Sequence, residues 1–254
     1  MPIDLNADVG ESYGAWVMGD DEGLLPLVTS ANIACGAHAG DPTVMARTVA
    51  LAARFGVTAG AHPGFPDRDG FGRRDLGMPS DELEASLLAQ LGALSAIAGA
   101  AGVRLRHVKP HGALYNRAST DAALAETVAR AVRRFSDELV LVGLAGSLLL
   151  EAGGAAGLTV AGEGFADRAY EPDGSLRSRH LPGAVHTDPD VVAAQAVAIA
   201  CDRVARTSDG SLVTVEADTI CLHGDTPDAP ALARAVRRAL EAAGVEVRAL
   251  ADRS

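Results

Sequence analysis

The sequence predicts an α/β protein with a TIM-like (β/α) barrel of seven or eight units, in a single domain over residues 1–254. Short β-like runs alternate with longer helical ones from end to end, as a parallel sheet built from βα units requires. Units of this number and size match the length of such a barrel. No Ser/Pro-rich linker or charge run divides the chain, which favours one domain over two. A doubly wound open sheet is the chief alternative.

The predicted strands are the short runs between the helical segments. In chain order they are Ile3–Val9, Thr29–Cys35, Val57–His62, Leu105–Lys109, Leu139–Gly143, Leu158–Gly162 and Thr219–His223. The run Val245–Leu250 is a candidate eighth strand.

Helix signals lie between these strands as N-cap residues followed by proline, or as acidic first turns that suit the helix dipole. The first predicted helix begins at Asp41-Pro42 and ends near Gly56, and the second begins near Ser80 and ends near Gly99. The third begins at Asp188-Pro189 and runs beyond Cys201, and the last begins at Thr226-Pro227 and ends at Gly244. We expect them to form the outer ring. The segment Gly164–His186 has no clear periodicity and is long, which predicts a functional loop or lid.

Composition excludes several classes of function. The net charge of −11 argues against nucleic-acid binding, which needs a basic face, and favours a small-molecule or protein partner. The acidic N-terminus lacks the features of a secretory signal. The longest apolar stretch, Leu139–Leu150, is interrupted by glycines and is shorter than the ~20 residues of a membrane span, so no membrane segment is predicted. Three cysteines without CxxC spacing predict a reducing cytoplasm.

Polar residues capable of chemistry follow one predicted strand after another, at the carboxyl ends where (β/α) barrels assemble their active sites. These residues are Asn6, Asp8, Glu11, Cys35, His38, His62, Lys109, His111, Glu163, His223 and Asp225. We expect them to converge on one mouth of the barrel. A polar residue after a strand is more often a cap or turn former, and Asp41 and Thr226 are interpreted as N-caps.

The histidines and the single lysine stand out among these residues. Five of the seven histidines fall in or beside predicted loops of one rim: His38, His62, His111, His186 and His223. His107 lies within a strand and is expected in the core or on the outer face. Lys109 would be costly to bury unpaired, so it should contact a carboxylate or an anionic substrate. The cysteines Cys35, Cys201 and Cys221 are interpreted as small buried side chains.

Two glycine clusters lie at residues 60–67 and 70–74, but neither is a Walker-type phosphate loop. That motif needs a lysine after its second glycine, and the only lysine lies elsewhere; the pattern GxGxxG is also absent. A nucleotide would therefore be held by arginines, helix N-termini or loop amides. The candidate arginines are Arg73, Arg74, Arg168 and Arg179.

Seven longer motifs occur in order along the chain. They are DLNADVGES at 4–12, SANIACGAHAGDP at 30–42, GAHPGFPD with GFGRR within 60–74, VKPHGALYN at 108–116, EGFADRAY at 163–170, DGSLRSR at 173–179 and ICLHGDTP at 220–227. Together they resemble the LamB/YcsF family over essentially the whole chain. One departure is Ala37, where the family often carries a bulky aromatic, and it puts the shape of the pocket in question.

The resemblance implies a barrel related to the polysaccharide-deacetylase fold. It also implies the activity of the A subunit of bacterial 5-oxoprolinase, in which ATP as co-substrate drives the opening of the 5-oxoproline lactam to L-glutamate, together with the B and C subunits. ATP would phosphorylate the amide oxygen, and water would attack the activated carbon.

Our mechanistic hypothesis makes Asp8 or Glu163 the general base toward water, with a neighbouring histidine tuning the proton transfer. Lys109 and Arg168 would hold the substrate carboxylate or the developing charge. The remaining catalytic candidates are Glu11, His38, His62, His111, His223 and Asp225, and the substrate-binding candidates are Asn6, Asn32, Arg73, Arg74, Arg168 and Arg179.

Two rival hypotheses stay open. In the first, the chain is a metal-dependent deacetylase or amidohydrolase in which Asp8, His38 and His62 bind a divalent ion. In the second, it is a non-catalytic component that binds substrate or organises the complex.

Overall fold

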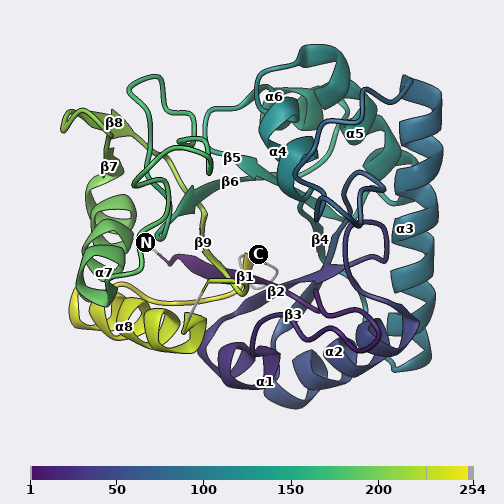
Figure 1. Cartoon of the computed structure of the whole chain (residues 1–254), viewed down its shortest axis with the longest axis horizontal. Coiled ribbons are helices and arrows are strands. Elements are labelled where there is room, and N and C mark those ends of the chain that lie inside the picture. The colour runs from purple at the N-terminus through teal and green to yellow at the C-terminus, as the bar shows by residue number, and fades with distance from the viewer. Residues whose placement is uncertain (1, 227, 251–254) are drawn as a thin grey trace.

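The computed structural model describes residues 2–226 and 228–250, and this part of the chain forms a closed barrel of seven parallel strands (Figure 1). The strands are β1 (Asp4–Val9), β2 (Ser30–Ala34), β3 (Thr58–His62), β4 (His107–Val108), β5 (Val140–Leu144), β6 (Val160–Phe165) and β9 (Thr219–His223). Strand β9 pairs with both β1 and β6, which closes the barrel and rules out the open sheet. The predicted TIM-like barrel is confirmed.

The barrel interior is polar because β1 alternates strictly between polar and apolar residues, and successive side chains of a strand point to opposite faces. Asp4, Asn6 and Asp8 hydrogen-bond to groups of neighbouring strands, whereas the intervening Leu5 and Ala7 belong to the hydrophobic core outside the barrel. TIM barrels are usually filled by branched aliphatic side chains. Here hydrogen-bonded polar groups take their place beneath the mouth.

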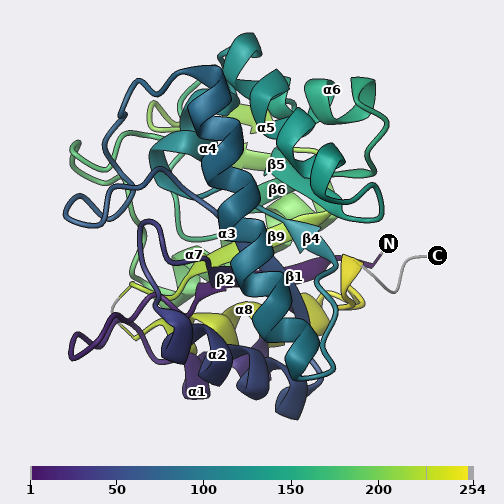
Figure 2. The ribbon, with the colours of Figure 1, turned by 90° about the vertical axis from the view of Figure 1, so that its right-hand side faces the viewer.

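Helices form the outer ring around the barrel (Figures 1 and 2). They are α1 (Asp21–Leu24), η1 (Leu25–Leu27), α2 (Pro42–Phe55), α3 (Ser80–Ala100), α4 (Gly112–Ala118), α5 (Ala122–Phe135), α6 (Leu148–Ala155), α7 (Pro189–Val197), η2 (Ala198–Asp202) and α8 (Ala229–Ala242). The loops after β1 and β3 project from the same end of the barrel in Figure 2. That end carries the carboxyl termini of the strands, where the candidate residues were expected.

Helix α2 shows why local sequence predicts some boundaries well. The side chain of Asp41 accepts hydrogen bonds from the backbone amides of Thr43 and Val44, and Pro42 follows it as the first helical residue. At the other end Gly56 adopts φ 67°, a left-handed conformation that glycine adopts without steric cost. The predicted start and end of this helix are confirmed.

Three local predictions are wrong. Val245–Leu250 is not a strand: Val247 makes only an isolated bridge to Ile3, so the barrel closes with seven strands. Cys201 is exposed rather than in the core, because α7 ends at Val197 and a wider π-helical turn carries Cys201 outward. The last helix begins at Ala229, after the Thr226 predicted as its cap; Pro227 lies outside the described residues.

Within the described ranges, α3 is the one helix whose length and apolar composition would suffice to cross a membrane. Its leucines at 83, 87, 91 and 94 are buried, and the helix packs against α2 and α5. Spacings of three and four residues place these leucines on one face. This face covers the barrel, as the core helix of a folded α/β domain does.

The segment predicted as a functional loop follows β6 and has no regular helix or strand from residue 166 to 188. Gln195 of α7 anchors its start, because its amide nitrogen donates to the carbonyls of Phe165, Ala166 and Arg168. A small antiparallel hairpin, β7 (Val204–Arg206) with β8 (Leu212–Thr214), follows α7. The segment contributes Arg168 and residues 176–180 to the cavity described next.

Candidate active site

A cavity of about 540 Å³ opens at the carboxyl ends of the strands. This is a usual size for a small-molecule site. Most of the expected ends contribute to it, through β1, β3, β4, β6 and β9 and the loops after them. Its polar and aromatic lining includes Asp8, His62, Arg73, Lys109, His111, Tyr115, Asn116, Phe165, Arg168, Arg177, Arg179, His180 and His223.

Lys109 is the charged centre of the cavity floor. Its ammonium nitrogen lies 2.9 Å from Asp8 Oδ1, 2.9 Å from Glu163 Oε1 and 2.9 Å from Cys221 Sγ. Burial acts to lower the pKa of Lys109, but Asp8, Cys221 and Glu163 outweigh it and raise that pKa well above its ordinary value. The predicted carboxylate contact of Lys109 is confirmed, and Cys221 lies in a polar setting rather than a purely apolar one.

Asp8 lies beside this ammonium group and stays ionised. Burial acts to raise the pKa of Asp8, but His62 and Lys109 together hold it well below the usual value. Asn32 donates to Asp8 Oδ1 at 2.8 Å, and Asn6 donates to Glu163 Oε1 at 2.9 Å. The two asparagines and Glu163 are buried beneath the cavity and do not line it. They support the floor from below.

His223 is paired with a carboxylate that sequence reasoning did not select. Its Nδ1 lies 2.9 Å from Asp167 Oδ2, and its ring stacks on Phe165 at 5.5 Å between centroids. Burial acts to raise the pKa of Asp167, but the charge and hydrogen bonds of His223 hold it below its ordinary value. The sequence offered one sign of Asp167: it is an acidic residue in the predicted functional loop, next to the candidate Arg168.

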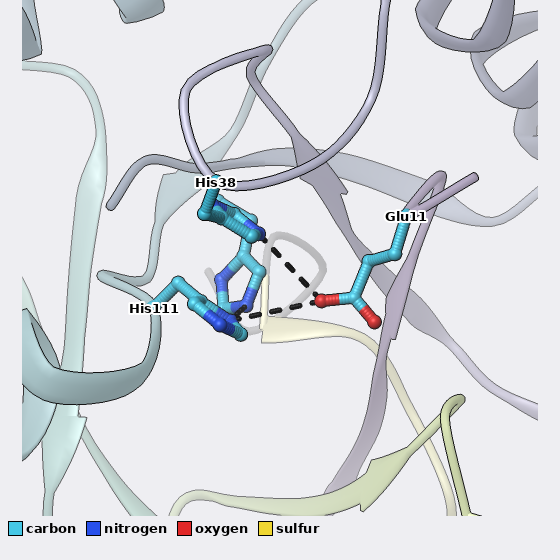
Figure 3. Close-up of side chains that lie close together, drawn as sticks. Glu11, His38 and His111 are labelled. Carbon is cyan, nitrogen blue, oxygen red and sulfur yellow. Dashed lines mark hydrogen bonds and ion pairs between the residues drawn. The ribbon is translucent and has the colours of Figure 1, made fainter. Parts of the chain in front are cut away.

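A second cluster, formed by Glu11, His38, His62 and His111, lies against the cavity floor. Figure 3 shows Glu11 with His38 and His111. Glu11 Oε1 is 3.6 Å from His38 Nε2 and 3.7 Å from His111 Nδ1, and the rings of His38 and His111 stack in parallel at 3.8 Å. Burial lowers the pKa of both stacked rings well below the usual value, so they are neutral. Burial and the nearby Asp8 raise the pKa of Glu11.

The predicted metal-binding set was Asp8, His38 and His62. The structure brings the two histidines together with Glu11 and His111 instead, within 4.8 Å of one another. Asp8 approaches this cluster only through His62, whose Nε2 lies 3.3 Å from Asp8 Oδ2. Asp8 belongs to another group of closely spaced atoms, with Cys221 and His223.

The arginine candidates divide into two sets. Arg73, Arg168 and Arg179 line the cavity, whereas Arg74 pairs with Asp67 and is largely exposed away from it. Arg73 pairs with Asp225, so Asp225 reaches the rim through this ion pair. Burial, with Arg179 nearby, lowers the pKa of Arg168 to about 10, which leaves its guanidinium charged at neutral pH.

The remaining sequence candidates lie outside the cavity, and one histidine that lines it was not predicted. His107 is buried inside the barrel, which is one of the two positions expected for it, and its Nε2 lies 2.8 Å from Asn32 Oδ1. His186 is half-buried and does not line the cavity, whereas His180, which was not selected, does. Ala37 is half-buried and lies outside the lining, so its departure from the family pattern does not change the cavity wall directly.

A closed (β/α) barrel with an acid, imidazole and ammonium floor at the carboxyl ends of its strands defines a TIM-like barrel enzyme. The particular family follows from comparison with known proteins. The LamB/YcsF family model matches residues 3–254, and the chain belongs to that family.

Named relatives and solved structures agree with this membership. The chain is 59% identical over 248 residues, 98% of each chain, to the A subunit of 5-oxoprolinase from Chloroflexus aggregans. It is 57% identical to the protein of the same name from Methylococcus capsulatus, covering 98% of this chain and 95% of the relative.

A solved lactam utilization protein from Thermus thermophilus superposes with a TM-score of 0.93 at 50% identity, covering 98% of this chain and 100% of the other. A putative cellobiose-phosphate cleavage protein from Enterococcus faecalis shares the fold alone, with a TM-score of 0.58 at 12% identity over 97% of this chain and 96% of the other.

Proposed function

We propose that this chain is the A subunit of an ATP-dependent 5-oxoprolinase, which opens the 5-oxoproline lactam to L-glutamate in a complex with the B and C subunits. The names of relatives that match along their whole length support this activity. The cysteines Cys35, Cys201 and Cys221 are all free, which suits a reducing cytoplasm as the place of the reaction.

The substrate suits the two sides of the cavity. 5-Oxoproline carries one carboxylate and one ring amide. Arg168 and Arg179 on the loop side would bind the carboxylate, since guanidinium groups match carboxylates in charge and geometry. The ring carbonyl would then face the floor, where Lys109 offers a positive charge held by Asp8 and Glu163. This charge would stabilise negative charge that develops on the carbonyl oxygen.

ATP is the co-substrate of the proposed complex because hydrolysis of the five-membered lactam is uphill without coupling. Transfer of a phosphoryl group to the amide oxygen activates the ring carbon toward water. Breaking the C–N bond after water adds leaves an acyl phosphate, and a second water then releases phosphate and L-glutamate. The sequence carries no Walker-type loop, so any phosphoryl group that enters this cavity would be held by arginines, Arg73 among them.

His223 is the general base that the structure supports best. Its Nδ1 faces the carboxylate of Asp167, so a neutral ring presents its other nitrogen as an acceptor in the cavity. His223 would take a proton from the attacking water and return it to the ring nitrogen as the C–N bond breaks. Asp8, the alternative base, already accepts from Asn32 and Lys109 and holds the ammonium in place.

The observation that carries the proposal is that the His223–Asp167 pair and the Lys109 ammonium line one small cavity with arginines beside them. The test measures 5-oxoproline-dependent ATP hydrolysis and glutamate formation after the B and C subunits are added to the purified chain. We expect both products with the wild type and loss of both with His223→Gln. His186→Gln, outside the cavity, is the control and should retain activity.

The same experiment separates a catalyst from a scaffold. A chain that only organises the complex would support wild-type turnover when His223 or Lys109 is replaced, provided that circular dichroism shows a folded barrel. Full activity of both variants would end the proposal. Loss of activity with unchanged binding of 5-oxoproline by calorimetry would support catalysis in this chain.

A further inference from the structure

The four buried side chains Glu11, His38, His62 and His111 converge with their ligand atoms facing one another. Each is at most 6% exposed. Among the described residues, Glu11 Oε1 and His38 Nε2 have no hydrogen-bond partner, although they face each other at 3.6 Å. Buried polar atoms in proteins are almost always satisfied, so such a pair points to a partner of another kind.

The hydrogen bonds of the other two rings define which nitrogens are free. His62 Nδ1 lies 2.8 Å from the carbonyl oxygen of Lys109, and His111 Nε2 lies 2.8 Å from that of Phe71. A carbonyl only accepts, so each of these ring nitrogens donates. His62 Nε2 and His111 Nδ1, the two ring nitrogens that do not face a carbonyl, lie 2.9 Å apart and are the ones that could bind a cation.

The arrangement has the features of a metal centre. Histidine ligands usually donate their second ring nitrogen to a backbone carbonyl or carboxylate, as His62 and His111 do here. In a tetrahedral zinc site with bonds of about 2.0–2.1 Å, ligand nitrogens lie about 3.3 Å apart. The corresponding separations in the cluster, 2.9, 3.6 and 3.7 Å, lie around that value. Figure 3 shows one oxygen of Glu11 directed at the edges of the stacked His38 and His111 rings.

We propose that Glu11, His38, His62 and His111 bind one divalent transition-metal ion of the zinc type through Glu11 Oε1, His38 Nε2, His62 Nε2 and His111 Nδ1. Three imidazoles and one carboxylate suit Zn²⁺ or a neighbouring first-row ion better than Mg²⁺ or Ca²⁺, which prefer oxygen. His62 and His111 also line the cavity, so the ion would lie at its floor, beside Asp8. The inference goes beyond the proposed function, which requires no metal.

The test uses the full chain without an affinity tag, stripped with a chelator and titrated with Zn²⁺ by calorimetry. We expect one equivalent to bind and the melting temperature to rise with added Zn²⁺. Glu11→Gln keeps the shape of the side chain and should weaken binding at least about tenfold, as should His38→Gln. Circular dichroism and the melting temperature of the metal-free variants show whether they are folded.

Controls distinguish this centre from the nearby Asp8, Cys221 and His223. Cys221→Ser should leave Zn²⁺ affinity unchanged. Bound Co²⁺ should show the visible bands of a tetrahedral site without a sulfur-to-metal charge-transfer band. A sulfur-to-metal band would overturn the assignment, and so would loss of Zn²⁺ binding only in Cys221→Ser. A wild type that binds no stoichiometric metal would overturn it as well. Because the readout is binding, failure here leaves the 5-oxoprolinase assay as a separate test of the proposed function.

Discussion

Asp167 Oδ2 lies 2.9 Å from Nδ1 of His223, and Asp167 is completely buried while His223 reaches the cavity. The two residues are 56 positions apart and come from the loop after β6 and the end of β9. A buried carboxylate on Nδ1 fixes the orientation and tautomer of an imidazole, as in hydrolases that use histidine as a general base.

We therefore expect His223→Gln to lower kcat by about 10²–10⁴, the usual contribution of a general base. Asp167→Asn should lower kcat by a smaller factor with little change in KM, because it disturbs the tautomer of His223 and touches no substrate. Steady-state kinetics of the reconstituted complex measures both. Asp167→Asn should also change the pH profile of kcat, whereas a residue that is only structural would leave that profile unchanged.

Removal of the Lys109 ammonium should destabilise the barrel. Lys109→Met leaves Asp8 and Glu163 buried without their counter-charge, and breaking a buried ion pair from one side costs about 3–5 kcal/mol of unfolding free energy. Urea denaturation measures the difference. Adding Glu163→Gln to Lys109→Met should restore part of the loss.

The matched control for that variant is Arg104→Met, which removes an exposed ion pair with Glu138. We expect a change of about 0–1 kcal/mol, since exposed pairs contribute little. Similar losses of unfolding free energy in Lys109→Met and Arg104→Met would contradict the central place of Lys109 in the cavity floor.

Gly60 lies against the ring of His107 inside the barrel. A Cβ at Gly60 would overlap His107 Nε2, the atom that contacts Asn32. We expect Gly60→Ala to cost about 1–3 kcal/mol of unfolding free energy, as overpacked cores do. In a double-mutant cycle the cost should shrink in a His107→Ala background.

Gly92→Ala is the control for this steric effect. Gly92 lies in α3, and an added Cβ there meets no atom within 4 Å. We expect this variant to be more stable by about 0.5–1 kcal/mol, the gain of alanine over glycine in a helix. A loss at Gly92 comparable with that at Gly60 would point to a general sensitivity to helix and strand substitutions.

Glu84 should contribute a pH-dependent part of the stability. Hydrogen bonds from Arg130 and Arg134 hold the pKa of Glu84 below its ordinary 4.5, so folding favours its ionised form. A lowered folded pKa adds stability that is present above the unfolded pKa and is lost as the pH falls through the folded value. Glu84→Gln should therefore be less stable than the wild type at pH 7. The difference in unfolding free energy between the two proteins should disappear below about pH 4.5.

Urea unfolding across that pH range checks the expectation. Glu126→Gln is the control, because Glu126 is exposed on the same helix, α5, that carries Arg130. A gap between the wild type and Glu84→Gln that stays constant with pH would mean that Glu84 acts by packing rather than by charge.

The sequence alone predicted the barrel and the rim residues because these depend on local patterns. Apolar runs, Asp-Pro helix starts and glycine stops recur in units, and parallel strands deliver their carboxyl ends to one face. Strand β9 was predicted with its correct bounds, and helix α2 with its correct cap. Lys109 was expected to need a carboxylate because burying an unpaired ammonium is costly whatever the fold.

Only the tertiary structure decided which rim residues meet. Asp167 pairs with His223, Glu11 joins three histidines, and Arg74 pairs with Asp67 away from the cavity, although all came from similar motifs. Distances between groups far apart in the chain depend on barrel closure, on strand register and on the path of each loop. These are properties of the packed molecule, whereas the periodicity that predicted the elements is a property of neighbouring residues.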